Sequence, residues 1–395
     1  MTTPANVLVV GASAAGLSTV ESLRRKGYVG PITVLGDEAE APYDRPPLSK
    51  QVLAGAWERD RATLRPPELL DKLDAEFVLG DAAVGFDAAS RTVRTASGRT
   101  LTAAAVVLAT GVRARSLPGQ PELGGVHVLR TLADSLALRS ALGSCRRLVV
   151  VGEGVLGCEI AATARAMGIE VTITGPQAGP MAVQVGSLVS GVLAQLHAEQ
   201  GVRLRMGAAV ESLIGESGQV AGVRLATGEV LDADVVVVAI GAVPATDWLI
   251  GSGLTLDNGI VCDSTCRAAD GVFAVGDVAR WQHEHFGALV RLENRTNATE
   301  QAAAVAGAIL GDDTPYVPVP YFWTDQFDAK LQVHGILRAD AEVDIIEGDL
   351  TARRFVARFR NNGIVTGVLG WNMPKQTRLR RQDIVDGLAQ PAITH

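Results

Sequence analysis

The sequence predicts an α/β protein with two Rossmann-like dinucleotide-binding domains and a smaller C-terminal α+β domain. An apolar run that ends in a glycine-rich turn opens the chain, and the same pattern returns from Leu148 onward. Beyond Tyr316 the pattern changes to short alternating apolar runs and a final polar helix. Two strand–turn–helix–strand units in one chain indicate two nucleotide-type folds, or one such fold interrupted by another.

The first unit occupies the N-terminus. Residues 6–10 are an apolar strand, a helical pattern runs to Gly27, and residues 31–35 form a second strand. The intervening loop, GASAAG, is a G-x-G-x-x-G variant with Ser13 at its middle position. Glycines allow the tight turn and close helix packing, and the helix N-terminus favours a pyrophosphate. Asp37 follows the second strand, where a carboxylate can accept hydrogen bonds from ribose hydroxyls. Such a turn also occurs without a ligand, but the complete pattern favours a dinucleotide site.

The second unit runs from a strand at residues 148–151 through a helix to Gly168 and a strand at 169–174. Its loop, GEGVLG, has all three glycines, but Gly175 stands where a ribose-binding acid is expected. No arginine nearby can hold a 2′-phosphate, so we expect the site to discriminate weakly between NADH and NADPH. Gly175→Glu should shift the preference toward NADH. Glu153 can contact ribose or be a solvated acid at the helix start, and we favour the second interpretation.

Three further apolar runs, at residues 104–111, 234–241 and 271–277, each bring a glycine turn to the edge of a sheet. Residues 298–310 have helical composition, and Gly311 can end that helix. Short strands are expected at 352–359 and 363–371.

Composition excludes several classes of protein. The 395 residues are 47% hydrophobic and 20% charged, with a net charge of −7 and only 4% aromatic residues. A negative chain is unsuited to coating nucleic acid, and no apolar run reaches the roughly 18 residues of a membrane helix. The early first strand leaves no room for a signal peptide. Four cysteines without a C-x-x-C pair suit a reducing cytoplasm, where we expect the protein to work.

Longer strings carry a family resemblance. They are PYDRPPLSK (42–50), AVGDVA (274–279), RLENRTNATEQA (291–302), PYFWTDQFDAKLQVHG (320–335) and LGWNMPKQTRLRR (369–381). In this order, and along essentially the whole chain, the sequence resembles the FAD-dependent NAD(P)H:ferredoxin reductases of bacterial oxygenase systems, a group that includes putidaredoxin reductase and rubredoxin reductase.

The resemblance implies FAD in the first site and NADH or NADPH, with NADH slightly favoured, in the second. It implies an FAD-binding domain at residues 1–112 and 242–315, an NAD(P)H-binding domain at 113–241 and a C-terminal domain at 316–395. The implied activity is that of a ferredoxin–NAD(P)+ reductase, which passes electrons to a ferredoxin-type iron–sulfur protein that feeds an oxygenase.

By motif, the resemblance implies that Lys50 lies near flavin N5, with Glu159 as its partner in the catalytic pair. A cation there favours the charge gained by reduced flavin, and the carboxylate neutralises a buried ammonium. Without the resemblance, Lys50 reads as a surface residue and Glu159 as an ordinary helix charge; Arg130 remains equally open between FAD phosphates and the surface. The residues implied for FAD are Gly11, Ser13, Ala14, Ala15, Gly16, Asp37, Arg45, Lys50, Ala82, Thr110, Gly111, Arg130, Gly276, Asp277, Glu293, Asn294 and Arg295, and those for NAD(P)H are Gly152, Gly154, Val155, Leu156, Gly157 and Gly241.

The chain departs from the family pattern in two places. Arg295 stands where the family commonly has tryptophan, near the expected flavin edge or partner surface. Gly175 and Val183 stand where the family usually has an acid and then arginine. The second departure puts the choice of nicotinamide in doubt.

The cysteines bear on where the electrons go. None lies between Asp37 and Trp57, where disulfide reductases of the wider class carry a redox pair, and Cys262 and Cys266 are expected to be packing residues. No metal site is expected, so electrons must pass to a diffusible protein, quinone or oxygen. The basic run of Lys375, Arg378, Arg380 and Arg381 is either a partner surface or a solvated helix face, and residues 24–26 are a second candidate.

Two alternatives stay open. One is an NAD(P)H oxidase or quinone reductase on the same scaffold. The other is a flavin-bound regulatory protein without nicotinamide turnover, motivated by Gly175 and Val183. We expect no nucleic-acid or membrane partner, and a monomer or weak homodimer.

Overall fold

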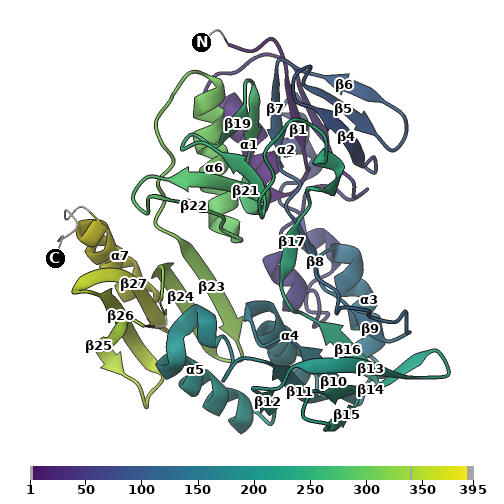
Figure 1. Cartoon of the computed structure of the whole chain (residues 1–395), viewed down its shortest axis with the longest axis vertical. Helices are drawn as coiled ribbons and strands as arrows, with labels where there is room; N and C mark the ends of the chain where they lie inside the picture. Colours follow the sequence, from purple (N-terminus) through teal and green to yellow (C-terminus); the bar gives the residue numbers. More distant parts are fainter. Residues whose placement is uncertain (1–2, 339, 389–395) are drawn as a thin grey trace. The chain divides into compact units, whose positions relative to one another are not determined.

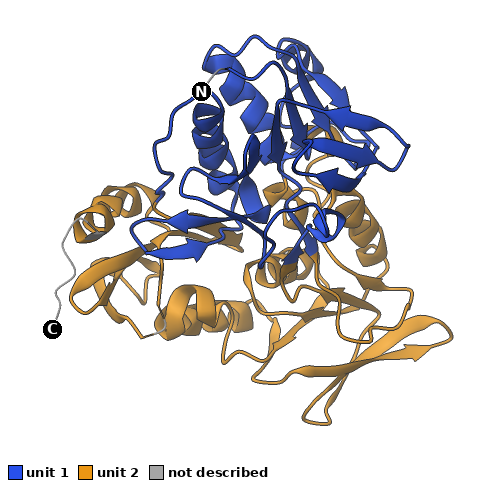
Figure 2. Ribbon diagram, turned by 45° about the horizontal axis from the view of Figure 1, so that its top comes forward, with its two compact units in different colours: residues 1–44, 62–113, 243–318 blue, residues 45–61, 114–242, 319–395 orange. Residues whose placement is uncertain are grey.

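The computed structural model describes residues 3–338 and 340–388, and the chain folds into two compact units (Figures 1 and 2). Unit 1 comprises residues 1–44, 62–113 and 243–318, and unit 2 comprises residues 45–61, 114–242 and 319–395. Two segments group differently from the domains expected from sequence. Residues 45–61 belong to unit 2, and the C-terminal part shares that unit with the second nucleotide fold.

Unit 1 is built on a six-stranded sheet. Its strands in spatial order are β19 (Arg267–Ala269), β20 (Val272–Ala274), β7 (Ala105–Leu108), β1 (Val7–Val10), β2 (Ile32–Leu35) and β3 (Glu76–Val78). All pair in parallel except the edge strand β19. β1 is buried along its whole length, as expected for an inner parallel strand with helices on its faces. Helices α1 (Ala14–Arg25) and α6 (Arg295–Ile309) pack against each other (Figure 1).

Shorter elements complete unit 1. They are the antiparallel sheet of β4 (Ala83–Asp87), β5 (Thr92–Thr95) and β6 (Thr100–Thr102); the sheet of β18 (Ile260–Cys262), β21 (Ala279–His283) and β22 (Ala288–Val290); helix α2 (Pro67–Asp71); and the 3₁₀ turns η3 (Asp247–Leu249) and η4 (Gly276–Val278). The chain passes from one unit to the other after residues 44, 61, 113, 242 and 318. The crossing after 61 lies in the turn η2 (Arg59–Ala62), and those after 113 and 242 lie in the strands β8 (Val112–Ala114) and β17 (Ala242–Pro244).

The first half of unit 2 repeats the nucleotide-type architecture. A parallel sheet runs in the order β12 (Arg203–Met206), β11 (Glu170–Gly175), β10 (Arg147–Val151), β16 (Val235–Val238) and β9 (Val126–His127). Its helices are α3 (Leu132–Leu142), α4 (Val155–Ala166) and α5 (Ala182–Glu199), and β13 (Val210–Glu216), β14 (Gln219–Leu225) and β15 (Val230–Asp232) form an antiparallel sheet. Helix α4 packs on β10 and β11 and also contacts η1 (Pro46–Ser49).

The C-terminal part of unit 2 is an antiparallel sheet with one helix. The strand order is β23 (Tyr321–Gln326), β24 (Ala329–Gly335), β27 (Ile364–Trp371), β26 (Arg354–Asn361) and β25 (Glu342–Asp349), and α7 (Pro374–Leu388) packs on β27 and β24. Strand β23 also contacts α4. Two Rossmann-like sheets and this α+β part confirm the predicted fold class. Among the described residues, no helix combines the length and apolar character of a membrane span.

Candidate functional site

The first glycine loop has two positions that only glycine can occupy. Gly11 has φ +117°, and an ideal Cβ there would lie 2.2 Å from the carbonyl oxygen of Ala109. A Cβ on Gly16 would lie 1.8 Å from the carbonyl oxygen of Gly11, so α1 can start this close to β1 only without it. Ser13 is the N-cap of α1, but its side chain makes no capping bond. The N–H groups of this helix start are therefore left for an anion.

The structure brings other predicted FAD residues to the same end of this sheet. Gly276 follows β20, and a Cβ on it would lie 3.0 Å from the Cβ of Ala15 in the loop. The Gly276 N–H donates to the buried Gln301 Oε1 at 2.7 Å. Asp277, next in η4, is half-buried, and its carbonyl accepts a bond from Arg291. Asp37 is exposed after β2.

The remaining unit 1 residues lie around loops and at the start of α6. Thr110 donates to the carbonyl of Ala245, and the Gly111 carbonyl accepts from the N–H of the same residue. Asn294 caps α6 by accepting from the Asn297 N–H. Ala82 is half-buried, and the exposed Glu293 pairs with Arg291.

Arg295, the residue that departs from the family pattern, is tied to a carboxylate. Its Nε lies 2.6 Å from Asp44 Oδ1, and its guanidinium also donates to Thr299. The cation is therefore neutralised in place and held along the first turn of α6.

Three residues predicted to serve FAD belong to unit 2: Arg45, Lys50 and Arg130. Arg45 Nη1 donates to the carbonyl of Arg130 at 2.6 Å. The Arg130 N–H in turn donates to Asp134, whose carboxylate also closes the capping box of α3 with Thr131. The two arginines thus meet at the start of α3.

The second glycine loop repeats the constraints of the first. Gly152 has φ +120°, and an ideal Cβ there would lie 2.2 Å from the Ala239 carbonyl oxygen. An ideal Cβ on Gly157 would lie 2.0 Å from the Gly152 carbonyl oxygen. Gly154 caps α4, and its open side faces the amide of Gln184, whose Nε2 would lie 3.9 Å from a Cβ there. Val155 and Leu156 form the first turn of α4, and Gly241 (φ +94°) follows β16 with open space beside it.

Sequence reasoning missed Gln184. Its Oε1 is buried without a hydrogen-bond partner beside the open side of the loop. Nothing in the spacing of the sequence brings the first turn of α5 to this loop, because the approach depends on the path of residues 175–181.

The interpretation of Glu153 as a solvated acid is wrong. The residue is 3% exposed, and its Oε1 accepts a 2.8 Å bond from the Gln177 N–H. A Cβ on Gly175 would lie 1.6 Å from Glu153 Oε2, so the carboxylate occupies the space where a side chain at 175 would begin. A glutamate at residue 175 would therefore have to displace the Glu153 carboxylate, and its predicted shift of the preference toward NADH stays a prediction.

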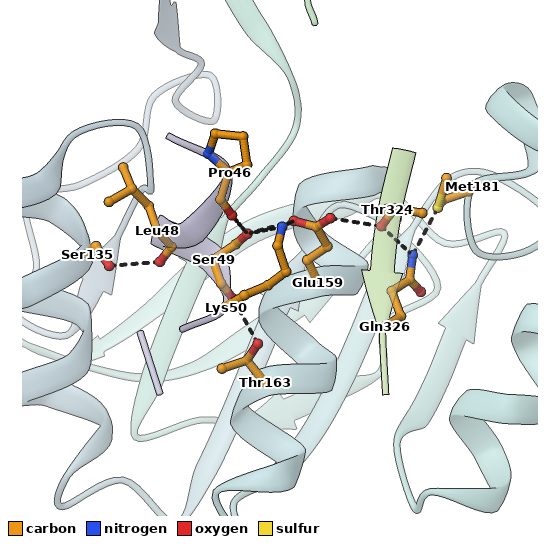
Figure 3. A network of polar contacts seen from close by, with 10 residues as sticks. All are labelled: Pro46, Leu48, Ser49, Lys50, Ser135, Glu159, Thr163, Met181, Thr324 and Gln326. Atoms are coloured by element: carbon orange, nitrogen blue, oxygen red, sulfur yellow. Dashed lines mark hydrogen bonds and ion pairs between the residues drawn. The ribbon is translucent and has the colours of Figure 1, made fainter. Parts of the chain in front are cut away.

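The expected pairing of Lys50 with Glu159 is present (Figure 3). Lys50 Nζ lies 2.6 Å from Glu159 Oε2, and the two side chains are only 13% and 7% exposed. Ser49 donates to the same oxygen at 2.6 Å. The PPLS segment is fixed to α4 and α3 through Thr163, which donates to the Ser49 carbonyl, and Ser135, which donates to the Leu48 carbonyl.

The network extends into the C-terminal sheet, which the sequence analysis did not anticipate. Thr324 of β23 donates to Glu159 Oε1 at 2.9 Å, so both carboxylate oxygens are satisfied. Gln326 donates to Thr324 and to Met181 Sδ (Figure 3). Its Oε1 bonds to His197 of α5 at 2.8 Å. Thr324 and Gln326 alternate along one strand, and this period of two was the signal that could have grouped them.

Asp325, between them on β23, is a second acid whose charge responds to the pair. Burial raises the pKa of its carboxyl; the Lys50 ammonium opposes this shift, and Glu159 adds to it. Lys50 and Glu159 thus act on the Asp325 pKa in opposite directions, and burial remains the main cause of its shift.

The cysteines are free thiols, and three of the four are buried. Burial raises the pKa of Cys145 to about 11 and that of Cys266 to about 12, and raises the pKa of Cys158 and Cys262 as well. Among the described residues, no group of His, Cys, Asp or Glu is arranged to hold a metal ion.

The C-terminal basic run has one paired and three exposed members. Arg380 pairs with Glu347, whereas Lys375, Arg378 and Arg381 are exposed on α7. In the second candidate patch, residues 24–26, the Arg24 guanidinium donates hydrogen bonds to four backbone carbonyls.

Two nucleotide-type folds, each with a glycine loop built for a pyrophosphate, place the chain in the class of two-dinucleotide oxidoreductases. The comparisons with known proteins agree and are more specific. The family model "Pyridine nucleotide-disulphide oxidoreductase" matches residues 5–302, and the model "Reductase C-terminal" matches residues 321–392. The chain belongs to this family, and the family membership inferred from its motifs is confirmed.

Named relatives cover most of the chain. Rhodocoxin reductase of Rhodococcus erythropolis is 38% identical over 89% of this chain and 82% of its own length. The benzene 1,2-dioxygenase system ferredoxin–NAD(+) reductase subunit of Pseudomonas putida is 37% identical over 87% of this chain and 84% of its own. The solved covalent putidaredoxin reductase–putidaredoxin complex matches with a TM-score of 0.91 and 32% identity, over 96% of this chain and 93% of that chain.

Proposed function

We propose that this protein is an FAD-dependent ferredoxin–NAD(P)+ reductase, which passes electrons from NAD(P)H to a ferredoxin-type iron–sulfur protein that feeds a bacterial oxygenase. The relatives support this activity, because they include the ferredoxin–NAD(+) reductase subunit of a benzene 1,2-dioxygenase system, a rhodocoxin reductase and a putidaredoxin reductase. FAD and NAD(P)H are the cofactors that agree with the family and with the two glycine loops. FAD supplies the chemistry: it accepts a hydride and can release electrons singly.

The observation that carries the proposal is the Lys50–Glu159 pair. Lys50 lies 2.6 Å from a carboxylate that also accepts from Ser49 and Thr324, so these contacts hold its ammonium in position. Such a cation stabilises negative charge that develops during a reaction, and it needs no reorganisation at that moment. We therefore assign Lys50 to flavin reduction and Glu159 to positioning it.

The unit 1 residues would hold the flavin nucleotide. The loop from Gly11 to Gly16 offers free N–H groups at the start of α1, and Gly276 brings the start of η4 against Ala15. Asp37 and Asp277 are the acids suited to ribose and ribityl hydroxyls. The unit 2 loop from Gly152 to Gly157 has the same features for the nicotinamide dinucleotide.

The electrons leave to a diffusible partner. All four cysteines are free thiols, which are already reduced, so none of them can accept electrons from the flavin. The exposed Lys375, Arg378 and Arg381 give α7 a basic face that suits an acidic ferredoxin. Free cysteines also suit a cytoplasmic protein, and we expect a monomer or weak homodimer without a nucleic-acid or membrane partner.

A direct test compares electron acceptors. The FAD-loaded protein is mixed with excess NADH, and consumption is followed with a [2Fe–2S] ferredoxin, a soluble quinone or oxygen alone. The proposal predicts fastest turnover with ferredoxin and a rate that falls with added salt. Equal turnover with oxygen alone, or faster turnover with quinone, would contradict it in favour of an oxidase or quinone reductase.

A further inference from the structure

In the second nucleotide fold, a loop residue places a carboxylate at the end of the second strand, where the sequence itself has glycine. Strand β11 ends at Gly175, but the carboxylate of Glu153 lies over this glycine, with Oε2 at 1.6 Å from the position of an ideal Cβ. Loop residue 153 and strand-end residue 175 therefore compete for one space. With a side chain at 175, the glutamate could not fold in; with glycine there, it does.

One oxygen of the Glu153 carboxylate accepts a hydrogen bond within the protein, and the other can still accept one. Oε1 accepts the bond from the Gln177 N–H at 2.8 Å. Oε2 accepts no hydrogen bond from any residue between 3 and 338 or between 340 and 388. This oxygen is also not sealed from solvent. A carboxylate held at one oxygen and open at the other is fixed in position and still able to accept.

The same bond removes a site for phosphate. Backbone N–H groups after the second strand are natural donors to an anion, and here the Gln177 N–H is already used by Glu153. The carboxylate also places negative charge where a 2′-phosphate would enter. Val183, with 66% exposure, offers no cation on the same segment.

We infer that Glu153 is the residue that selects the nicotinamide dinucleotide. Its Oε2 accepts from the adenosine ribose hydroxyls of NAD(H), and its charge repels the 2′-phosphate of NADP(H). This inference rests on the proposed function, because it assumes that the second loop binds a nicotinamide dinucleotide. It reverses the expectation that a missing strand-end acid leaves the site indifferent between the two.

The test measures binding by titration calorimetry with NAD⁺ and NADP⁺, using the FAD-loaded protein without turnover. Glu153→Gln retains an oxygen for the Gln177 N–H and removes the charge. The inference predicts that wild-type protein binds NAD⁺ at least about tenfold more tightly than NADP⁺. Glu153→Gln should weaken NAD⁺ binding by about 10- to 150-fold, the range for a lost charged hydrogen bond, and reduce the preference.

Two further variants separate an acid that binds from one that only fills space. Glu170→Gln, at the exposed start of β11, is the matched control and should leave both dissociation constants within about twofold. Glu153→Ala/Gly175→Glu moves the acid from the loop to the strand end, where the deleted side chain leaves room. It should recover NAD⁺ binding to within a few-fold of wild type, and this recovery remains measurable if Glu153→Gln fails to fold.

The outcomes distinguish the two proposals. Unchanged preference in folded Glu153→Gln, or no recovery in the double variant, would overturn the role of Glu153 alone. Wild-type protein that binds neither NAD⁺ nor NADP⁺ would instead contradict the proposed function.

Discussion

The first and second glycine loops place the same steric constraints on their first and last glycines. Gly11 and Gly152 have φ +117° and +120°, and each would place a Cβ 2.2 Å from a carbonyl oxygen of the neighbouring strand. The loops differ at their second residue, which is Ala12 in one and Glu153 in the other. Both residues pack on a glycine at the end of the next strand, Gly36 or Gly175.

That difference relocates the acid of the fold. In the first fold the small Ala12 leaves the acids to the segment after Gly36, where Asp37 and Glu38 follow. In the second fold, Pro176 and Gln177 follow Gly175, and the carboxylate comes from the loop instead. The acid of a strand–turn–helix–strand unit can thus come from the loop after its first strand or from the segment after its second strand. A loop acid requires that the residue facing it at the end of the second strand has no side chain.

The largest expected effect comes from the shared backbone. Gly152→Ala should destabilise the protein by about 3 kcal/mol or more, because the new Cβ meets a rigid carbonyl at a positive φ, and Gly11→Ala should do the same. Gly154→Ala, with ordinary φ and open space, should cost about 1 kcal/mol or less. Urea unfolding measures all three, and equal losses at 152 and 154 would contradict the assigned roles.

The next largest effect on stability distinguishes the two helices that follow the glycine loops, α4 and α1. Two residues after the last loop glycine, α4 carries Glu159, whereas α1 carries the buried Ser18. Glu159→Gln should destabilise the protein by about 3 kcal/mol, because Lys50 loses its counter-charge but keeps a hydrogen-bond acceptor, and it should slow flavin reduction. Ser18→Ala, which breaks no ion pair, should cost less than about 1 kcal/mol. Recovery of stability, but not of reduction rate, is expected when Lys50→Met is added to Glu159→Gln.

A smaller effect tests the contact between the loop and the strand-end glycine. Gly175→Ala should cost about 2 kcal/mol because its methyl group meets the Glu153 carboxylate. Glu153→Ala in the same chain should recover at least about 1 kcal/mol of that loss, a coupling typical of residues in contact. Strictly additive losses in the double-variant cycle would mean that the two residues do not compete for space.

The smallest effect concerns Cys158, which stands in α4 where α1 has Leu17. A thiol at a helix start is usually activated, but burial, with Glu153 and Glu159 adding to it, raises the pKa of Cys158. With the Cys145 pKa raised to about 11, only roughly one thousandth of that thiol is ionised at pH 8. We expect almost no thiol titration of native protein at pH 8, rising as the pH approaches 11. Rapid modification of any cysteine at pH 8 would contradict this.

The sequence predicted the fold well because its evidence is local. Apolar runs ending at Gly11 and Gly152 require strand, turn and helix in that order, and β1–α1–β2 and β10–α4–β11 lie where the pattern indicated. Helices α3 and α5 and the small antiparallel sheets were not predicted. The Lys50–Glu159 pair depended on the family strings, since no spacing relates residues so far apart in the chain.

The buried position of Glu153 was missed for a related reason. Whether a loop carboxylate turns outward or inward depends on the presence of a Cβ at residue 175, on another strand. The Thr324 and Gln326 contacts were missed because they join the C-terminal sheet to α4 and α5. Local patterns identify elements, but they do not say which side chains meet across them.

The most direct test of the central claim is anaerobic mixing of the FAD-loaded protein with NADH and, separately, with NADPH, while the visible flavin absorbance is followed. A reductase whose second loop holds Glu153 over Gly175 predicts rapid bleaching by NADH, at concentrations where NADPH reacts at least about tenfold more slowly. Flavin that stays oxidised with both dinucleotides would contradict the account and point to a flavin-bound protein without nicotinamide turnover.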